Sequence, residues 1–324
     1  MQEVTTKDKV LQLLKETPHF LSGEKMAQQL QVSRTSIWKA IKELEKMGYQ
    51  FIHQAKGYRY LPSDILDAQE IYQTLLPFEP NLNVFVVEHS ESTMKDARLA
   101  ATKANGPALF VANMQEQAHG RFGRPFFAAP GQGIYMSLLI HPNQRFDELP
   151  QYTIIAASAC VKAIWELTGK DTMIKWVNDI YLNGKKISGI LSEAISNMET
   201  GEISSIIIGI GLNFSIPQEN FPEGIQHIAS SLFLDGQKTI TRNQLIGQIW
   251  KNFYLFLLDT TNDYLTLYRK KSFVLGKKVS FNQKGQQYTG IAEKIGNYGE
   301  LIVQIGNQSV TLSSGEISLT SIEA

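Results

Sequence analysis

Residues 175–193, KWVNDIYLNGKKISGILSE, set the expected architecture at the centre of the chain. Asn183 and Gly184 separate two apolar runs, and an Asn-Gly pair in that position is a strong signal for a tight β-hairpin. The hairpin brings a carboxylate, Asp179, near an ammonium, Lys186. Such a pair can hold a metal-bound phosphate beside an acidic co-substrate, whereas a turn aspartate and a solvated lysine are the plainer alternative.

Short β-branched or apolar runs alternate with helical patterns on both sides of this hairpin. The alternation predicts a mixed α/β sheet with helices packed against it. Strands are expected at residues 84–90, 108–114, 133–140 and 204–214. One helix is expected to start near Met94, and a second, longer helix is expected over about 151–167.

A glycine-rich basic segment, QEQAHGRFGRPF at residues 115–126, lies between two of these strands. Gly120 and Gly123 let the backbone curl with its N–H groups inward, and Arg121 and Arg124 add positive charge. This combination suits a polyphosphate or a phosphate ester. A basic surface turn would look similar.

Two further segments contain candidate binding residues. In GIGLNF, residues 209–214, two glycines on a buried strand leave room for a flat ligand and Asn213 follows, although a bulge or a close strand crossing would also explain the glycines. In HSESTMKD, residues 89–96, Ser92 and Thr93 either bind a ligand or cap the helix that follows.

The N-terminal segment reads as a winged helix-turn-helix. Ser33 occupies an N-cap position, and apolar residues then recur at helical spacing as far as Gly48. Two strands around Gly57 would form the wing. A recognition helix of this kind enters the DNA major groove, while a winged helix that contacts only protein is the alternative, and Trp38 is expected to pack. The expected DNA contacts are Ser33, Arg34, Thr35, Ser36, Lys39, Lys42, Lys56 and Arg59.

The charge distribution agrees with a polyanion partner at one end of the chain. The whole chain holds 31 basic and 31 acidic side chains, so its net charge attracts neither nucleic acid nor membrane. Residues 1–62 hold ten basic and six acidic side chains, a net charge of +4 against −4 for the remainder. Such an asymmetry favours a polyanion partner for the N-terminal module.

The single cysteine excludes an intramolecular disulfide and a cysteine-based zinc site. Cys160 lies in the apolar run TIIAASAC, where a small buried hydrophobe is expected, and a reducing cytoplasm is favoured. The polar N-terminus lacks a signal-type apolar core, and no run approaches the roughly 18 apolar residues of a membrane span. We therefore expect a cytoplasmic protein without a membrane partner.

The C-terminal stretch has short strands at regular intervals with glycine-containing turns, which favours a small β-barrel of about 50 residues. The whole chain, with 324 residues, is thus expected to be an α+β, multidomain protein. The predicted domains are a winged helix-turn-helix at 1–63, a mixed α/β domain at 67–271 and a small β-barrel at 274–324.

Four ordered motifs together resemble the biotin–protein ligases, and the winged helix makes the resemblance specific to the bifunctional bacterial type. The first is the glycine-rich loop, with Gln115, Gly120, Arg121, Gly123, Arg124 and Phe126 in register. The others are KWVND, the lysine motif from Lys186 to Leu191, and GIGLN. The resemblance covers nearly the whole chain, and it implies a class II aminoacyl-tRNA synthetase/biotin ligase-like central domain and an SH3-like barrel.

The chain departs from the family pattern at five positions. Ala118 and His119 stand where the loop usually has Gly and Arg, and Val177 replaces Pro. Met94 replaces a polar residue, and Phe126 stands where Trp is common. Ala118 stiffens the loop and His119 is fully charged only at lower pH, so loop closure or retention of an intermediate is expected to differ.

The resemblance implies a role for each motif residue in adenylating biotin with ATP and Mg²⁺. Lys186, Arg121 and Asp179 would be catalytic, and Asp179 would also hold the metal ion. Biotin would contact Ser92, Thr93, Gln115, Gly120, Arg121, Tyr135, Lys186, Gly189, Gly209 and Gly211. ATP or the adenylate would contact Arg121, Arg124, Phe126, Lys175, Asn178, Asp179, Lys186 and Asn213.

The resemblance also implies a biotin–[acetyl-CoA-carboxylase] ligase that represses biotin genes. Its partners would be a biotin carboxyl carrier protein, operator DNA and a second copy of the chain in a ligand-promoted homodimer. The alternatives are a metabolite-sensing repressor with an inactive ligase domain, a ligase for lipoate or octanoate, and a plain ligase without a DNA function.

Overall fold

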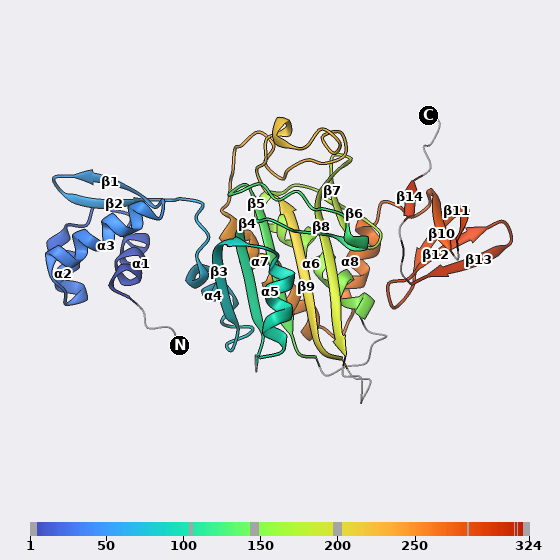
Figure 1. The fold of residues 1–324 in the computed structure, drawn as a ribbon, viewed down its shortest axis with the longest axis horizontal. Coiled ribbons are helices and arrows are strands. Elements are labelled where there is room, and N and C mark those ends of the chain that lie inside the picture. The colour runs from blue at the N-terminus through green and yellow to red at the C-terminus, as the bar shows by residue number, and fades with distance from the viewer. Residues whose placement is uncertain are drawn as a thin grey trace. The chain divides into compact units, whose positions relative to one another are not determined.

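The computed structural model describes residues 5–103, 106–142, 149–196, 203–283, 285–313, 315 and 317–319. The chain forms two compact units, Met1–Ile65 and Leu66–Ala324 (Figure 1). Each unit has its own hydrophobic core. The predicted boundary within the second unit, between residues 271 and 274, stays a prediction.

The first unit is the predicted helix-turn-helix with a two-stranded wing. Ser22 and Ser33 cap the second and third helices, because their hydroxyls accept from the backbone N–H groups of Lys25 and Ser36. The elements are α1 (Thr6–Glu16), α2 (Gly23–Leu30), α3 (Arg34–Lys46), β1 (Gln50–Gln54) and β2 (Gly57–Leu61). The buried face of α3 consists of Ile37, Ala40, Ile41 and Leu44, as its spacing predicts.

A backbone bridge joins the wing to the segment between α1 and α2. The backbones of Leu21 and Tyr58 exchange two hydrogen bonds of 2.9 Å. Gly57, next to this bridge, has φ +121°, and a Cβ there would lie 2.2 Å from the carbonyl oxygen of Leu21. Only glycine fits this close approach of two backbones.

The second unit contains a seven-stranded mixed sheet, as predicted from the alternating pattern. Its order is β3-β4-β5-β9-β8-β7-β6, with β3 and β4 parallel and the other neighbours antiparallel. The strands are β3 (Asn83–Ser90), β4 (Ala108–Gln115), β5 (Gly133–Ile140), β6 (Met173–Lys175), β7 (Asp179–Leu182), β8 (Lys185–Ser196) and β9 (Ile203–Asn213).

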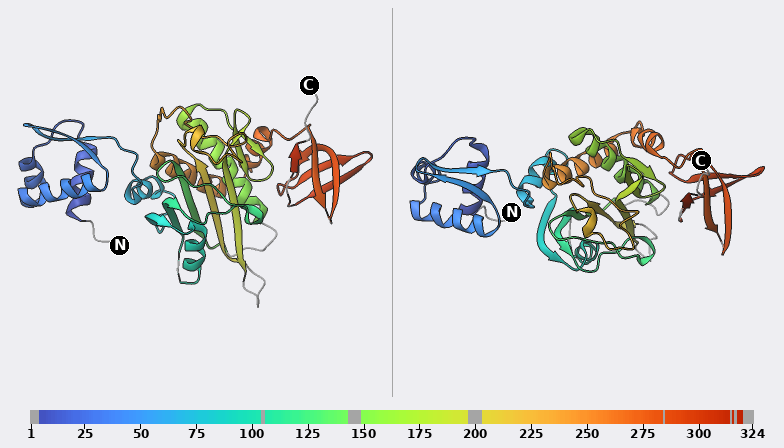
Figure 2. Two further views of the ribbon diagram at one scale, coloured as in Figure 1. Left: turned by 45° about the horizontal axis from the view of Figure 1, so that its top comes forward. Right: turned by 90° about the horizontal axis from the view of Figure 1, so that it is seen from above.

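Helices cover both faces of this sheet (Figures 1 and 2). The long helices α6 and α7 pack on one face and form most of the core with it, while α5 covers the other face over β4, β5 and β9. The helices are α4 (Ala68–Leu75), α5 (Thr93–Ala101), α6 (Leu149–Thr168), α7 (Arg242–Leu258) and α8 (Asp263–Lys271). Cys160 is buried in this core, and burial raises the pKa of its thiol, so it behaves as the small hydrophobe expected.

The C-terminal segment forms an antiparallel sheet in the order β13-β12-β11-β10-β14. Its strands are β10 (Lys278–Gln283), β11 (Gln286–Ile295), β12 (Leu301–Ile305), β13 (Gln308–Leu312) and β14 (Ile317–Leu319). Closure of this sheet into the expected barrel stays a prediction. The turn before β12 is bonded to the rest of the unit, because the indole N–H of Trp176 donates to the carbonyl of Gly299 over 2.9 Å. Among the described residues no helix is both long and apolar enough to cross a membrane.

The substitution Gly57→Ala should destabilise the first unit by more than about 2 kcal/mol, because it combines a positive φ with overlap against Leu21. Amide hydrogen exchange of the full chain would report this as faster exchange of residues in α1–α3. Gly23→Ala is the matched control, since a Cβ there meets only the ring of Tyr58 at 3.8 Å. Equal exchange rates in the two variants would contradict the role assigned to Gly57.

Candidate functional site

A cavity of about 320 Å³ lies in the second unit, between the segment that follows β4, strands β8 and β9, and residues 221–229. It collects every residue predicted to bind a small-molecule ligand except Tyr135. These lining residues are Ser92, Thr93, Gln115, Gly120, Arg121, Arg124, Phe126, Lys175, Asn178, Asp179, Lys186, Gly189, Gly209, Gly211 and Asn213.

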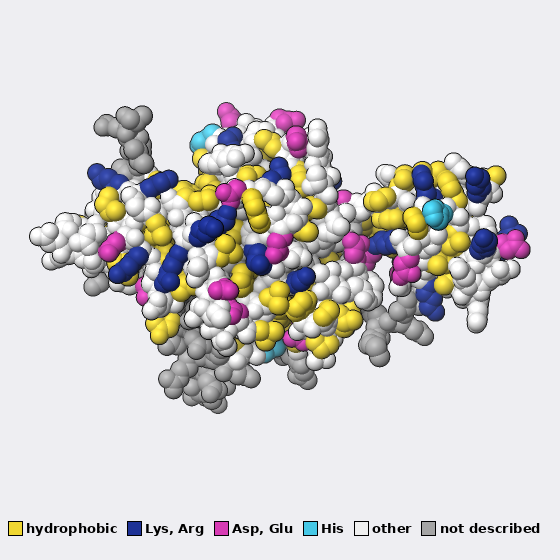
Figure 3. All heavy atoms as spheres, turned by 180° about the vertical axis from the view of Figure 1, so that it is seen from behind, with side chains coloured by type: hydrophobic (Ala, Val, Ile, Leu, Met, Phe, Trp, Pro, Cys, Tyr) yellow, Lys and Arg dark blue, Asp and Glu magenta, His cyan; other side chains and the backbone are white. Residues whose placement is uncertain are grey.

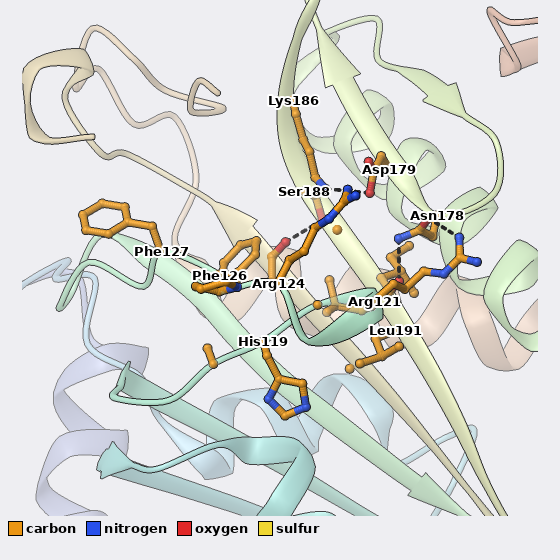
Figure 4. A pocket seen from close by; sticks show the side chains of 18 of the residues that line it. His119, Arg121, Arg124, Phe126, Phe127, Asn178, Asp179, Lys186, Ser188 and Leu191 are labelled. Carbon is orange, nitrogen blue, oxygen red and sulfur yellow. Dashed lines mark hydrogen bonds and ion pairs between the residues drawn. The ribbon is translucent and has the colours of Figure 1, made fainter. Parts of the chain in front are cut away.

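The hairpin of β7 and β8 brings Lys186 and Asp179 together, as the sequence predicts. The Lys186 ammonium lies 2.7 Å from a carboxylate oxygen of Asp179, and both side chains are partly exposed, at 35% and 20%. Figure 4 shows the side chains of Lys186 and Arg124 both reaching toward Asp179. This ion pair therefore leaves the lysine reachable by a ligand in the cavity.

The basic loop reaches the same place through Arg121. A guanidinium nitrogen of Arg121 donates to the side-chain oxygen of Asn178 over 3.1 Å, and the Asn178 amide donates in turn to the carbonyl of Ile190. The loop curls as expected, since the Gly120 N–H donates to the carbonyl of Arg124 over 2.8 Å. His119 points away from this group (Figure 4). The cavity thus has a cationic end built from two loops.

The opposite end of the cavity is neutral and polar. The oxygen of the Gln115 side chain accepts from the Thr93 N–H over 2.7 Å and from the Thr93 hydroxyl over 3.1 Å. Thr93 also shares a hydrogen bond of 2.8 Å with Ser137. Ser92 is the N-cap residue of α5 but makes no side-chain capping bond, so capping alone does not explain the Ser-Thr pair.

Ser137 is a site residue that the sequence analysis did not predict. It lies in the apolar strand β5, completely buried, and it lines the cavity. The only signal is that, apart from Tyr135, it is the one polar side chain in GIYMSLLI. A hydroxyl in an otherwise apolar buried strand needs a partner, so it could have been picked out as a site candidate.

The glycine strand β9 makes room for two side chains in this structure. A Cβ on Gly209 would lie 2.5 Å from the sulfur of Met94, and one on Gly211 would lie 2.6 Å from the ring of Phe126. Close approach is therefore the reason for both glycines, and Met94 and Phe126 line the slot themselves.

Tyr135 is not at the surface of the cavity, which differs from the predicted lining role. Its side chain is completely buried, and its hydroxyl donates to the carbonyl of Ala129 over 2.9 Å. Burial raises the pKa of this phenol. Its ring meets the ring of Phe126 edge-on, with the ring centroids 6.4 Å apart, so it packs against a residue that lines the cavity.

Among the described residues Asp179 is the only carboxylate that lines the cavity, and this limits the metal that the site can hold. Among the described residues no group of three or more His, Cys, Asp or Glu could bind a metal ion. Mg²⁺ usually takes one or two carboxylates and receives its other ligands from phosphates and water. One carboxylate beside a cationic end fits Mg²⁺ that arrives with a nucleotide.

In the first unit, only some of the predicted DNA contacts lie free on the surface. Arg34, Thr35 and Lys39 are exposed on the outer face of α3, and Lys56 is exposed in the wing turn. On the face seen in Figure 3, basic side chains lie at separate places with acidic ones between them. The basic groups of this unit are therefore dispersed over that face rather than gathered in one patch.

The other predicted DNA contacts have partners within the unit. The Ser33 and Ser36 hydroxyls bond each other over 2.8 Å, and Ser33 caps α3. Lys42 bonds Glu45 over 2.8 Å, and this hydrogen bond lowers the pKa of the Glu45 carboxyl. Arg59 stacks over the ring of Phe20 at 5.1 Å. Trp38, expected to pack, is instead 53% exposed on α3.

Comparisons with known proteins define the class of this fold and site. Residues 84–213 match the biotin/lipoate A/B protein ligase family, residues 6–59 match a helix-turn-helix domain, and residues 274–320 match the biotin protein ligase C-terminal domain. The chain therefore combines a cofactor-ligase domain with a helix-turn-helix module and a C-terminal domain typical of biotin ligases.

Individual relatives narrow the class. The bifunctional ligase/repressor BirA of Bacillus subtilis is 32% identical over 93% of this chain and 94% of its own length. The BirA of Escherichia coli is 26% identical over the full length of both chains. A biotin protein ligase from Aquifex aeolicus, solved with biotin and ATP, matches with a TM-score of 0.61 and 26% identity over 74% of this chain and 98% of its own. The chain belongs to the family of bifunctional biotin ligase/repressors.

Proposed function

We propose that this chain activates biotin with ATP as biotinyl-5'-AMP and transfers the biotinyl group to a lysine of a biotin carboxyl carrier protein, that of acetyl-CoA carboxylase or of another biotin-dependent carboxylase. The observation that carries the proposal is that one cavity joins a neutral polar group, Thr93 with Gln115, to a cationic group that contains Lys186 and Arg121. Such a cavity suits an uncharged ureido ring at one end and phosphates at the other.

The first step joins two anions. A carboxylate is a poor acylating agent because its leaving group would be oxide. An oxygen of the biotin carboxylate therefore attacks the α-phosphorus of ATP, the new O–P bond forms as the bond to the β-phosphate oxygen breaks, and pyrophosphate leaves. Lys186 would offset the repulsion between the two anions and the charge of the transition state, while Arg121 and Arg124 bind phosphates.

The second step transfers the biotinyl group. The carrier lysine attacks the acyl carbon as a neutral amine, a C–N bond forms, the C–O bond to AMP breaks, and the amine gives up a proton as AMP leaves. Water must be excluded until the carrier arrives. Residues 116–126 and 214–224 are the segments proposed to cover the adenylate, with Phe126 over the adenine.

Mg²⁺ is part of the proposed reaction. Asp179, with Asn213 nearby on the cavity wall, would hold the metal ion together with the triphosphate, and the metal would neutralise phosphate charge. The side-chain amide of Asn213 donates to the carbonyl of Ser230 over 3.0 Å, which fixes the orientation of this residue.

The remaining proposals concern organisation and location. The domains would be the winged helix at 1–63, the ligase domain at 67–271 and the C-terminal module at 274–324. The N-terminal unit would bind operator DNA, and biotinyl-adenylate would promote a homodimer that occupies two half-sites. A cytoplasmic location is supported by a lone cysteine that is completely buried.

Replacing Lys186 with Met should slow adenylate formation by about 10²- to 10³-fold, because the charge between the two anions is lost. Biotin-dependent exchange of labelled pyrophosphate into ATP measures this step directly. Lys162→Met is the matched control, since Lys162 pairs with Glu166 on α6, outside the cavity lining. An undiminished rate in Lys186→Met would refute the role assigned to this lysine.

The same exchange assay distinguishes the rivals. A repressor with an inactive ligase domain would give no exchange in the parent chain, whereas a lipoate or octanoate ligase would exchange with that acid in preference to biotin. The Lys186–Asp179 pair and the Arg121–Asn178 bond, both intact in the cavity, support an active enzyme.

Lys39→Ala should weaken DNA binding and make log K depend less steeply on log salt by about 0.9, the contribution of one phosphate contact. Duplexes selected from a random library with biotin and ATP present provide the operator, and fluorescence anisotropy gives the slope. Lys162→Ala should keep the parent slope. A parent chain that binds selected and scrambled duplexes equally would be a plain ligase.

Biotin and ATP added together should double the sedimenting mass of the chain. The Lys186→Met variant should keep the monomer mass of 36.4 kDa when biotin and ATP are added, because it would form little adenylate over the experiment. Analytical ultracentrifugation measures both. If the parent chain keeps its monomer mass with both substrates present, the proposed dimer switch is wrong.

A further inference from the structure

Two glutamine side chains brace the segment that follows β9. The Gln218 amide, on the short helix η3 (Gln218–Asn220), donates to the carbonyls of Gln226 over 2.6 Å and of Ala229 over 3.1 Å. The Gln226 amide donates back to the carbonyls of Phe221 over 2.8 Å and of Glu219 over 3.3 Å. Gln218 therefore bonds the stretch that contains Gln226, and Gln226 bonds the stretch that contains Gln218. We call residues 216–230 the braced segment.

The braced segment is bonded directly to the backbone of Lys186. The Lys186 N–H donates to the carbonyl of Ile228 over 2.8 Å, and the Lys186 carbonyl accepts from the N–H of Ser230 over 2.9 Å. The neighbouring Lys185 ammonium lies 3.4 Å from the carbonyl of Gln226, the same carbonyl that Gln218 reaches. The main chain at Lys186 is therefore fixed by β7 on one side and by the braced segment on the other.

The inner side of the braced segment forms part of the cavity wall. Phe221, Ile225 and Ile228 all line the cavity. Phe221 is buried and its ring packs against that of Phe127 at 5.9 Å. One short stretch of chain thus bonds the lysine backbone and forms part of the cavity wall. Four hydrogen bonds donated by two side-chain amides tie its first half to its second, in addition to its backbone turns.

We propose that Gln218 and Gln226 are positioning residues for the adenylation reaction. They hold the braced segment against Lys186 and keep the wall closed over the activated acyl group, although neither side chain lines the cavity. The inference rests on the proposed function. A donor is required at both positions because every partner is a backbone carbonyl, so a side chain of the same length without N–H groups leaves these carbonyls unpaired.

The test uses Gln226→Met and Gln218→Met in the full-length chain, with biotin and ATP present and no carrier protein. Without an acceptor, AMP appears only as the adenylate escapes or meets water, so its steady release measures leakage. Each variant should leak about tenfold faster, and adenylate formation should slow by a similar factor, because two hydrogen bonds are lost. The KM for biotin should stay within about twofold of the parent, since the polar end at Thr93 is untouched.

Hydrogen exchange gives a second readout that does not depend on turnover. The amides of Lys186 and Ser230 should exchange faster in both variants, because their bonds join β8 to the braced segment. Gln237→Met is the matched control: Gln237 is exposed and lies outside the segment, and this variant should match the parent in both measurements. A Gln226→Glu variant, also without the amide donors, should behave like Gln226→Met.

The outcomes separate this inference from the proposed function. If the parent chain forms no adenylate, the proposed function fails. If the parent forms it and the folded Gln218 and Gln226 variants leak and exchange at parental rates, the positioning role is overturned while the function stands. A variant that loses cooperative unfolding and biotin binding together would also overturn it, since the glutamines would then be supporting the whole unit.

Discussion

The chemistry of this chain depends on one electrostatic problem, the approach of two anions within a single cavity. In the proposed reaction Lys186 would supply the charge that makes the approach feasible, and Asp179, 2.7 Å away, would keep that charge in place before the ligands arrive. In water such a pair is worth little, but a partly enclosed cavity strengthens it and makes its orientation matter. The hairpin holds both residues, and in our proposal Gln218 and Gln226 fix the lysine backbone. Both features would therefore keep the Lys186 charge in its position in the cavity.

Local sequence signals predicted much of the fold. Ser33 with its helical apolar spacing predicted α3, and the Asn183-Gly184 turn predicted the hairpin of β7 and β8, because caps and tight turns depend on neighbouring residues only. Helix α7 could have been predicted as well, since Thr241 and Gln244 form a capping box. The strand order of the large sheet was beyond reach, because it depends on packing between distant segments.

The residues of the candidate site also fall into those that sequence motifs predicted and those that they did not. Motif residues such as Lys186 and Arg121 were predicted because the chemistry restricts their type and spacing. Tyr135 was assigned to the cavity lining by the family resemblance, which gives its place in the chain but not that its side chain is completely buried against the ring of Phe126. Ser137 belongs to no motif, and its partner Thr93 lies 44 positions away in the sequence. Gln218 and Gln226 bond carbonyls only 5 to 11 positions away, but these bonds depend on an irregular backbone that no short sequence pattern specifies.

The hydrogen bond between Trp176 and Gly299 links the C-terminal sheet to the wall of the cavity. Trp176 lies two residues before Asn178, and its indole N–H would lose its acceptor if the turn before β12 were removed. Arg269 likewise donates to the carbonyls of Ile295 and Gly296. A ligase shortened to its large sheet would therefore expose a buried tryptophan and an unpaired arginine. Truncation before the C-terminal sheet should therefore disturb the main chain that carries Asn178 and Asp179.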